Sequence, residues 1–145
     1  MEIRTKYHGV IEVEQKDIVH FQNGLPGFLE EKSFILLQLD NELPFYILQS
    51  TVTAELGFVI VNPFQFFTTY EFDLSDNDKA QLKLETEQDV VVYTILNVKD
   101  PFEDSTANLQ APIVLNTSNN EAKQIILNDP RYQTKQSIFS ENAVK

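Results

Sequence analysis

The sequence predicts a mostly β fold, an antiparallel barrel-like or sandwich single domain with one or two short helices. Short runs rich in β-branched and aromatic residues recur along the chain, and clusters of Gly, Pro, Asn and Asp separate them. The strongest runs lie centrally, at residues 45–48 and 58–61, before an Asn-Pro turn at 62–63. Such runs are typical of strands with at least one buried face.

The first half of the chain is expected to hold several short strands. Residues 4–14 alternate between apolar and polar types around Gly9, which predicts a strand with a bend or a bulge. A second strand at 17–21 leads into the densest turn cluster, residues 23–27, where glycines allow a positive φ. Residues 33–39 predict a third strand before a polar connection.

Further strands and one helix are expected after the central block. Asp73 or Ser75 suits the N-cap of a short helix that ends near Leu84, because both side chains accept hydrogen bonds from free N–H groups. Residues 90–98 predict a strong strand. Pro112 interrupts a strand predicted at 108–116, which indicates a sheet edge or a bulge.

The remaining local predictions concern shorter or less regular segments. One helical turn is expected at 28–32, an acidic loop at 85–89, and a strand or helical turn at 121–128. The domain is predicted to span residues 1–132 and to be followed by a loosely held C-terminal tail, residues 133–145.

The chain has 145 residues, which is the size of one domain. Its 42% hydrophobic and 23% charged residues are typical of an ordinary globular protein. The absence of cysteine excludes disulfides and thiolate chemistry, and it suits a cytoplasmic location. Neither a signal peptide nor a membrane-spanning run is present, so no membrane association is expected. The formal net charge of −11 makes direct nucleic-acid binding unfavourable and suits a basic protein partner or simple solubility.

The sequence contains little that indicates catalysis, a cofactor or a metal. It lacks phosphate-binding glycine loops and the common catalytic motifs, and its two histidines, His8 and His20, fall on predicted strands. Asp73, Asp76 and Asp78 have the wrong spacing for a calcium loop and fit a helix start better. Two alternatives stay open: a small β-barrel enzyme that uses His20 with a carboxylate, and a barrel that holds a small ligand between aromatic walls.

Charge and aromatic residues together favour a protein-binding module. Residues 33–78 contain several acids and no Lys or Arg, and an aromatic cluster occupies 64–72. Apolar anchors with a charged rim are common in protein interfaces. The predicted contacts are Glu71 and Asp73 beside the aromatic cluster, and Phe102, Glu103 and Asp104 on a later loop.

A series of short motifs follows in order along the chain from residue 5 to about residue 132. These pieces are Tyr7-His8-Gly9, Phe21, Gly24-Leu25-Pro26-Gly27-Phe28, Leu48-Gln49-Ser50, Phe58, Asn62-Pro63-Phe64, Tyr70-Glu71, Asn108-Leu109, Ala111-Pro112-Ile113 and Gln124. In their order and spacing the chain resembles the bacterial flagellar assembly factor FliW family. Gln22 and Asn62 stand where the family often has Pro and Asp.

The resemblance implies a compact antiparallel barrel that acts without catalysis or a cofactor. Proteins of this family bind flagellin in the cytoplasm and also bind CsrA, an RNA-binding repressor of flagellin translation. When flagellin accumulates, it binds the factor, and the released CsrA represses translation of the flagellin message. Acidic charge would speed association with a basic regulator. The factor could occupy the RNA site as a mimic or bind beside it and repel phosphate, and the resemblance favours the second, non-competitive version. A groove near Asn108, Leu109 and the edge expected at Pro112 is a candidate for a flagellin helix or strand.

Overall fold

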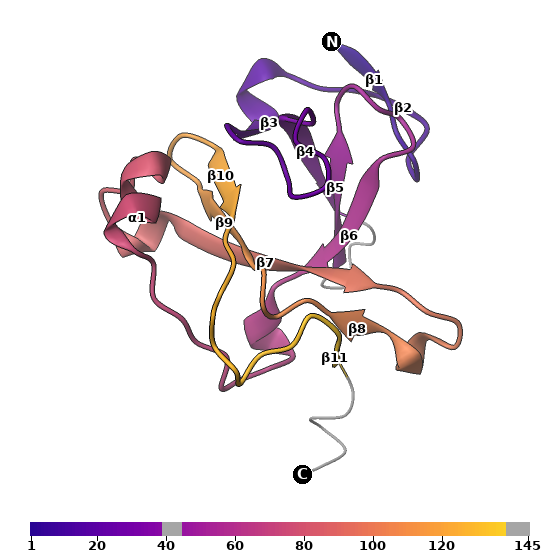
Figure 1. Cartoon of the computed structure of the whole chain (residues 1–145). Helices are drawn as coiled ribbons and strands as arrows, with labels where there is room; N and C mark the ends of the chain where they lie inside the picture. Colours follow the sequence, from indigo (N-terminus) through magenta and orange to yellow (C-terminus); the bar gives the residue numbers. More distant parts are fainter. Residues whose placement is uncertain (39–44, 139–145) are drawn as a thin grey trace.

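The computed structural model describes residues 1–38 and 45–138, which form short strands and one α-helix (Figure 1). The strands are β1 Glu2–Arg4, β2 Val10–Glu12, β3 Ile18–Phe21, β4 Ser33–Gln38, β5 Phe45–Ser50, β6 Gly57–Val61, β7 Val90–Asn97, β8 Thr106–Ala107, β9 Ile113–Asn116, β10 Glu121–Gln124 and β11 Gln136–Ser137. The helix α1 is Asp76–Leu82, and 3-10 turns occur at Gln15–Asp17, Pro63–Gln65, Glu87–Asp89 and Phe102–Asp104. The polar connection expected after residue 39 lies outside the described residues.

Seven strands close into a barrel in the order β7-β6-β5-β4-β3-β10-β9, and β9 pairs back with β7. All neighbours in the barrel are antiparallel except β3 and β10, where Glu121 lies opposite His20 in a parallel register. The parallel pair arises because the β9–β10 hairpin inserts between β7 and β3. The predicted mostly β fold is confirmed, and ring closure makes it a barrel rather than a sandwich.

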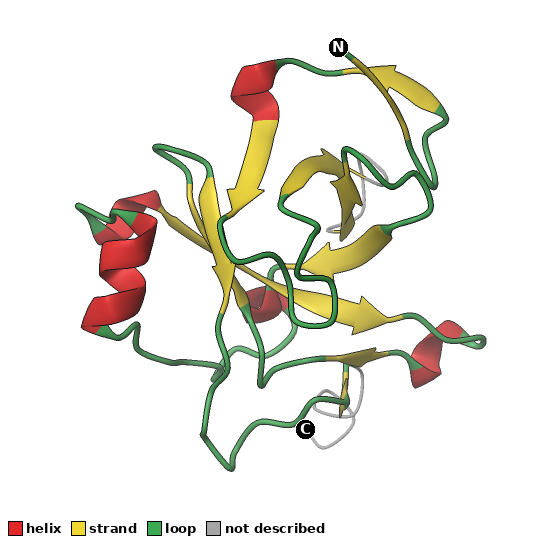
Figure 2. Ribbon diagram, turned by 45° about the horizontal axis from the view of Figure 1, so that its top comes forward, coloured by secondary structure: helices red, strands yellow, loops and turns green. Residues whose placement is uncertain are grey.

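Smaller elements surround the barrel (Figure 2). The β1–β2 hairpin packs at one end, where Ile3 and Val13 contact Ile35 of β4. Two short strands, β8 and β11, extend the sheet beyond β7. Helix α1 lies beside β9 and β10, with Leu82 packed against Val114. A groove lies between α1 and the start of β7.

Hydrophobic side chains fill the barrel. Every barrel strand contributes a buried or half-buried residue to the interior cluster, and burial of each large side chain contributes ~1.5–3 kcal/mol. Its buried members are Val19, Phe21, Leu25, Phe34, Leu48, Ile60, Ile113, Leu115 and Ala122. A second cluster lies outside the barrel, where Phe67, Tyr70 and Tyr132 cover β6, β7 and β8.

The N-terminal segment differs from the single bulged strand that the alternation predicts. Strands β1 and β2 form a hairpin, with Arg4 opposite Val10. Gly9 has φ +67° in the connecting turn, and its carbonyl accepts a hydrogen bond from the Thr5 N–H at 2.8 Å. Glycine here serves a turn rather than a bulge, and His8 lies in the turn rather than on a strand.

Helix α1 confirms the predicted helix, since the Ser75 side chain accepts a hydrogen bond from the Asp78 N–H at 3.0 Å. The helical turn expected at 28–32 is instead a tight turn, in which the Glu31 N–H donates a 3.0 Å hydrogen bond to the Phe28 carbonyl. Only Ile113–Asn116 of the strand predicted at 108–116 forms β9. That strand lies between β7 and β10, so Pro112 precedes an interior strand and no open edge exists there.

Part of the predicted tail belongs to the packed domain. Gln136 and Ser137 form β11 against β8, and Ile138 is fully buried in the second cluster. Residues 133–138 therefore differ from the loosely held segment expected, because pairing with β8 and burial of Ile138 hold them. The rest of the predicted tail, residues 139–145, lies outside the described residues. Over residues 1–38 and 45–138, no helix has the length and hydrophobicity needed to cross a membrane.

Candidate functional site

The residues that the sequence predicts as partner contacts lie in separate places on the barrel (Figure 1). Glu71 and Asp73 are exposed on the segment that leads into α1. Phe102, Glu103 and Asp104 form the exposed 3-10 turn between β7 and β8. The fold therefore does not bring the predicted contacts together into one site.

The third predicted group, Asn108 and Leu109, has mainly structural contacts. The Leu109 side chain is only 3% exposed, and its carbonyl accepts a 2.6 Å hydrogen bond from the Tyr70 hydroxyl. Asn108 Oδ1 accepts hydrogen bonds from the N–H groups of Gln110 and Ala111. Leu109 thus belongs to the core, while Asn108 also borders a surface groove.

Asp73 lies on the rim of a groove of about 630 Å³ that we call the acidic groove. Its lining comes from β7, the 3-10 turn at Pro63–Gln65, α1 and the residues that flank α1. Its lining residues are Phe64, Phe72, Asp73, Leu74, Lys79, Leu84, Glu85, Thr86, Glu87, Val90 and Val92. This groove combines exposed aromatic surface with carboxylates, as the sequence predicted for Asp73 and the aromatic cluster.

The carboxylates of the acidic groove are not neutralised by the described part of the chain. Asp73, Glu85 and Glu87 are exposed, and none of them forms an ion pair with a described residue. Lys79 is the cation in the lining. The groove therefore carries three carboxylates against one ammonium group.

The neighbouring acid on α1 behaves differently. Asp78 Oδ1 lies 2.5 Å from Lys123 Nζ of β10, which also bonds Gln81. Partial burial alone would raise the pKa of Asp78, but the hydrogen bonds and charge of Lys123 and the Ser75 contacts outweigh it and lower the pKa. The Asp78–Lys123 ion pair thus joins α1 to β10, and the charge of Asp78 is already paired within the chain.

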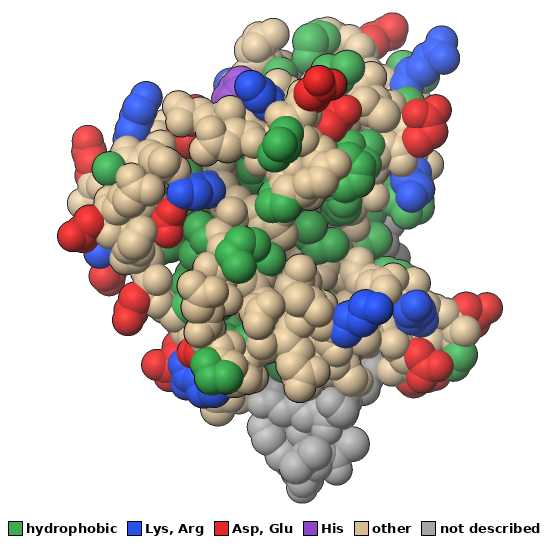
Figure 3. All heavy atoms as spheres, viewed as in Figure 1, with side chains coloured by type: hydrophobic (Ala, Val, Ile, Leu, Met, Phe, Trp, Pro, Cys, Tyr) green, Lys and Arg blue, Asp and Glu red, His purple; other side chains and the backbone are tan. Residues whose placement is uncertain are grey.

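A second surface, which we call the apolar face, has the opposite chemistry. It is a depression of about 300 Å³, and among the described residues that line it none carries a charge. Those residues are Leu25, Pro26, Phe28, Phe58, Ile95, Asn108, Gln110, Ala111, Gln124, Ile126 and Thr134. Phe28 is 42% exposed and Ile126 is 60% exposed. Figure 3 shows hydrophobic side chains gathered near the middle of the molecule, over β6, β7 and β10.

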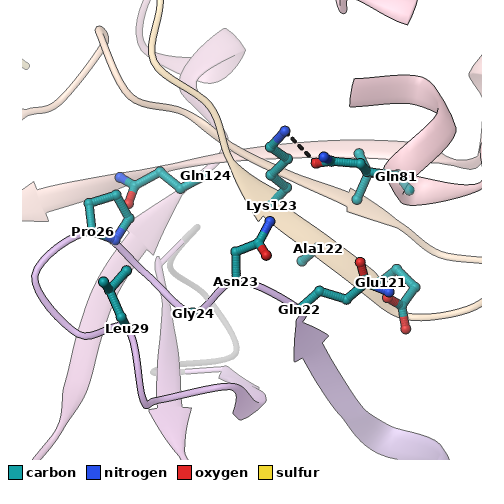
Figure 4. Close-up of a pocket in the computed structure, with 11 residues that line it drawn as sticks. Gln22, Asn23, Gly24, Pro26, Leu29, Gln81, Glu121, Ala122, Lys123 and Gln124 are labelled. Carbon is teal, nitrogen blue, oxygen red and sulfur yellow. Dashed lines mark hydrogen bonds between the residues drawn. The ribbon is translucent and has the colours of Figure 1, made fainter. Parts of the chain in front are cut away.

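A smaller depression of about 160 Å³ adjoins the apolar face and shares Pro26 and Gln124 with it (Figure 4). The turn at residues 22–29 forms one wall and β10 forms the other. Lys123 points from β10 toward Gln81, to which it donates a 2.6 Å hydrogen bond. The turn therefore separates two hollows and presents Phe28 and Leu29 to solvent.

Sequence reasoning named one residue of the apolar face, Asn108, and missed the others. Its residues come from six separate stretches of the chain, so no local pattern marks them. One signal was present: Phe28 directly follows the turn cluster at 23–27, and connecting turns run over the protein surface.

The alternative hypotheses find little support in the geometry. His20 is exposed on β3 and lines none of the three depressions described above. The barrel interior, where a small ligand would have to bind, is packed with side chains. Within the described residues, no group of three or more His, Asp or Glu is arranged to hold a metal ion.

Comparison with known proteins identifies the family. The model of the family described as FliW protein matches residues 2–138. The chain belongs to the FliW family. The flagellar assembly factor FliW of Geobacillus thermodenitrificans (strain NG80-2) is 56% identical over 145 residues, which cover 100% of both chains. The protein of the same name from Bacillus subtilis (strain 168) is 48% identical over 142 residues, 98% of this chain and 99% of that one.

A crystal structure of the flagellar assembly factor FliW also resembles the chain. It is 57% identical, has a TM-score of 0.91, and the match covers 95% of this chain and 96% of that one. The barrel described above is therefore the FliW fold.

Most of the residues that carry the resemblance to the FliW family build the fold rather than a binding surface. Gly24 has φ +67°, and a Cβ there would lie 2.4 Å from the Leu29 carbonyl oxygen. Asn62 caps the following 3-10 turn by accepting a hydrogen bond from the Phe64 N–H at 2.9 Å. Gln124 donates a 2.9 Å hydrogen bond to the Ala111 carbonyl. The FliW motifs thus explain the architecture, whereas the acidic rim lies largely outside them.

Proposed function

We propose that this chain is a cytoplasmic flagellar assembly factor that acts by binding two proteins, flagellin and the translational regulator CsrA, and that it transforms no substrate. The observation that carries the proposal is membership of the FliW family over the whole domain, with relatives named as assembly factors. In this scheme flagellin that accumulates takes up the factor, and CsrA is then free to repress the flagellin message.

The geometry supports a protein with two kinds of partner. The acidic groove and the apolar face differ in charge, and they are lined by different residues. A flagellin segment is proposed to dock on the apolar face, because an amphipathic helix needs an uncharged groove with exposed apolar anchors. Ile126 and Phe28 would supply those anchors, and Asn108 and Gln124 would hydrogen-bond the segment.

The net charge of −11 also bears on how CsrA would be inhibited. A strongly acidic protein bound beside an RNA-binding surface repels the phosphate backbone without occupying the surface itself. An acidic protein could also occupy that surface as a mimic of RNA, and it is the resemblance to the FliW family that favours non-competitive inhibition. RNA titration tests this: the bound factor should lower the apparent RNA affinity of CsrA, and at saturating RNA part of the factor should remain bound in a ternary complex.

Calorimetric titration of the purified chain with flagellin and with CsrA tests the proposal directly. Both should bind, and flagellin added to a preformed CsrA complex should release CsrA. Failure of both proteins to bind the purified chain would overturn the proposal.

A matched pair of variants tests the flagellin site. Ile126→Asp puts a charge on the apolar face and should weaken flagellin binding about tenfold or more, since a buried unpaired charge is costly. Val52→Asp is the control, because Val52 is 83% exposed and lines neither surface. Equal flagellin affinity of the two variants would exclude the apolar face as the site.

A further inference from the structure

We propose that the acidic groove is a docking site for a cationic amphipathic segment, one that places apolar side chains on the groove floor and Lys or Arg side chains on its rim. This inference rests on the proposed function in that a basic regulator is one of the proposed partners. It goes further by naming the surface and the chemistry that the surface recognises.

The shape and floor of the groove suit a few apolar side chains. Phe64 is 41% exposed at its edge, and its ring is supported from behind by Tyr70 at a centroid distance of 5.8 Å. Phe72, Leu74 and Leu84 are half-buried along the floor. A volume of about 630 Å³ is within the range of sites that enclose a small ligand, so it accommodates part of a peptide segment rather than a whole domain surface.

The rim determines the charge of the occupant. Asp73 lies on one side, Glu85 and Glu87 lie on the connection between α1 and β7, and Lys79 is the opposing cation. Because no described residue forms an ion pair with the three carboxylates, their charge is available to a partner. The same charge repels an acidic segment, so the groove discriminates by sign as well as by shape.

The part of the rim that carries Glu85 and Glu87 is also held in place before any partner arrives. Asn116 Nδ2 donates a 2.8 Å hydrogen bond to the Leu82 carbonyl at the end of α1, and the Thr117 N–H donates one of 2.8 Å to the Asp89 carbonyl. Thr86 Oγ1 accepts a hydrogen bond from the Gln88 N–H between the two rim glutamates. A backbone fixed in this way reduces the ordering entropy that binding must overcome.

The test compares two triple variants with equal change of charge. Asp73→Asn, Glu85→Gln and Glu87→Gln together neutralise the rim. The control neutralises three exposed acids near the β1–β2 hairpin, by Glu2→Gln, Glu14→Gln and Asp17→Asn. The probes are purified CsrA and a synthetic peptide with leucines at helical spacing flanked by Lys and Arg. Circular dichroism and thermal unfolding verify that both variants are folded.

The rim variant should bind both probes about tenfold more weakly than the control, since three exposed charge contacts of modest strength are lost. The wild-type affinity for the peptide should also fall as salt rises from about 0.1 M to about 1 M, because screening shortens the Debye length from about 10 Å to about 3 Å. Phe64→Ser should weaken the binding of both probes without changing the salt dependence of that binding.

Equal affinities of the rim and control variants, or equal binding of a peptide with Glu in place of its cations, would overturn the inference. If that result came with tight CsrA binding by the wild type, the proposed function would stand and only the groove would be excluded. Peptide binding that depends on the rim, together with no CsrA binding, would support the groove and reject CsrA as its partner.

Discussion

The side chain of Gln49 organises the turn between β5 and β6, and its replacement gives a quantitative test of the fold. Gln49 is fully buried. Its Nε2 lies 3.0 to 3.4 Å from the carbonyl oxygens of four residues of this connection, and its Oε1 accepts a 2.9 Å hydrogen bond from the Lys6 N–H. The two amide hydrogens are therefore shared among several backbone carbonyls.

Gln49→Leu keeps the approximate volume of the side chain and removes these bonds. The Lys6 N–H and at least one turn carbonyl then lose their partner in a protected site. At ~1–1.5 kcal/mol for each of two to three lost hydrogen bonds, the free energy of unfolding should fall by about 3 kcal/mol.

Urea unfolding followed by circular dichroism measures the loss, with Gln38→Leu as the control. Gln38 is an exposed residue at the end of β4, and its substitution should change the free energy of unfolding by less than ~0.5 kcal/mol. A Gln49→Leu loss no larger than that of the control would refute the argument that this amide holds the turn.

Three further predictions concern other positions. Gly24→Ala should cost more than ~2 kcal/mol in urea unfolding, because its Cβ would overlap backbone at φ +67°, whereas Gly27→Ala, with open space around it, should cost about 1 kcal/mol. Burial, and then the nearby Tyr132, raise the pKa of Tyr70, so its contribution to stability is full below pH ~10 and is lost as pH rises further; Tyr70→Phe should flatten the stability profile above that pH. The pKa of Asp78 is lowered, so its contribution is full above pH ~4 and is lost as pH falls; Asp78→Asn should reduce the acid sensitivity of the unfolding midpoint.

The local features of the fold were predictable because local side-chain chemistry sets them. Continuous apolar runs, rich in β-branched and aromatic residues, marked β4, β5, β6 and β7 to within one or two residues, and Ser75 marked the start of α1. The glycine at position 9 was interpreted as a bulge, although its positive φ serves a hairpin turn. One glycine could not distinguish a bulge from a hairpin turn, because both need a residue with positive φ.

The candidate surfaces were only partly predictable. Asp73 lies in one groove with the exposed Phe64, because acids and aromatics are neighbours in the sequence there, and its role as a partner contact stays a prediction. Glu85 and Glu87 complete the rim only because α1 folds back beside β7. Leu109 was expected at a surface and is buried, because Tyr70 and the C-terminal segment cover it.

The sequence by itself determined that this is a small, acidic, mostly β protein without cysteine chemistry, and its ordered motifs indicated the FliW family. Those properties depend on composition, local periodicity and spacing. The tertiary structure alone decided that β9 closes the barrel on β7, and which side chains face solvent. It did so because strand pairing across the chain brings together residues that no local pattern relates, and exposure depends on what packs above each residue.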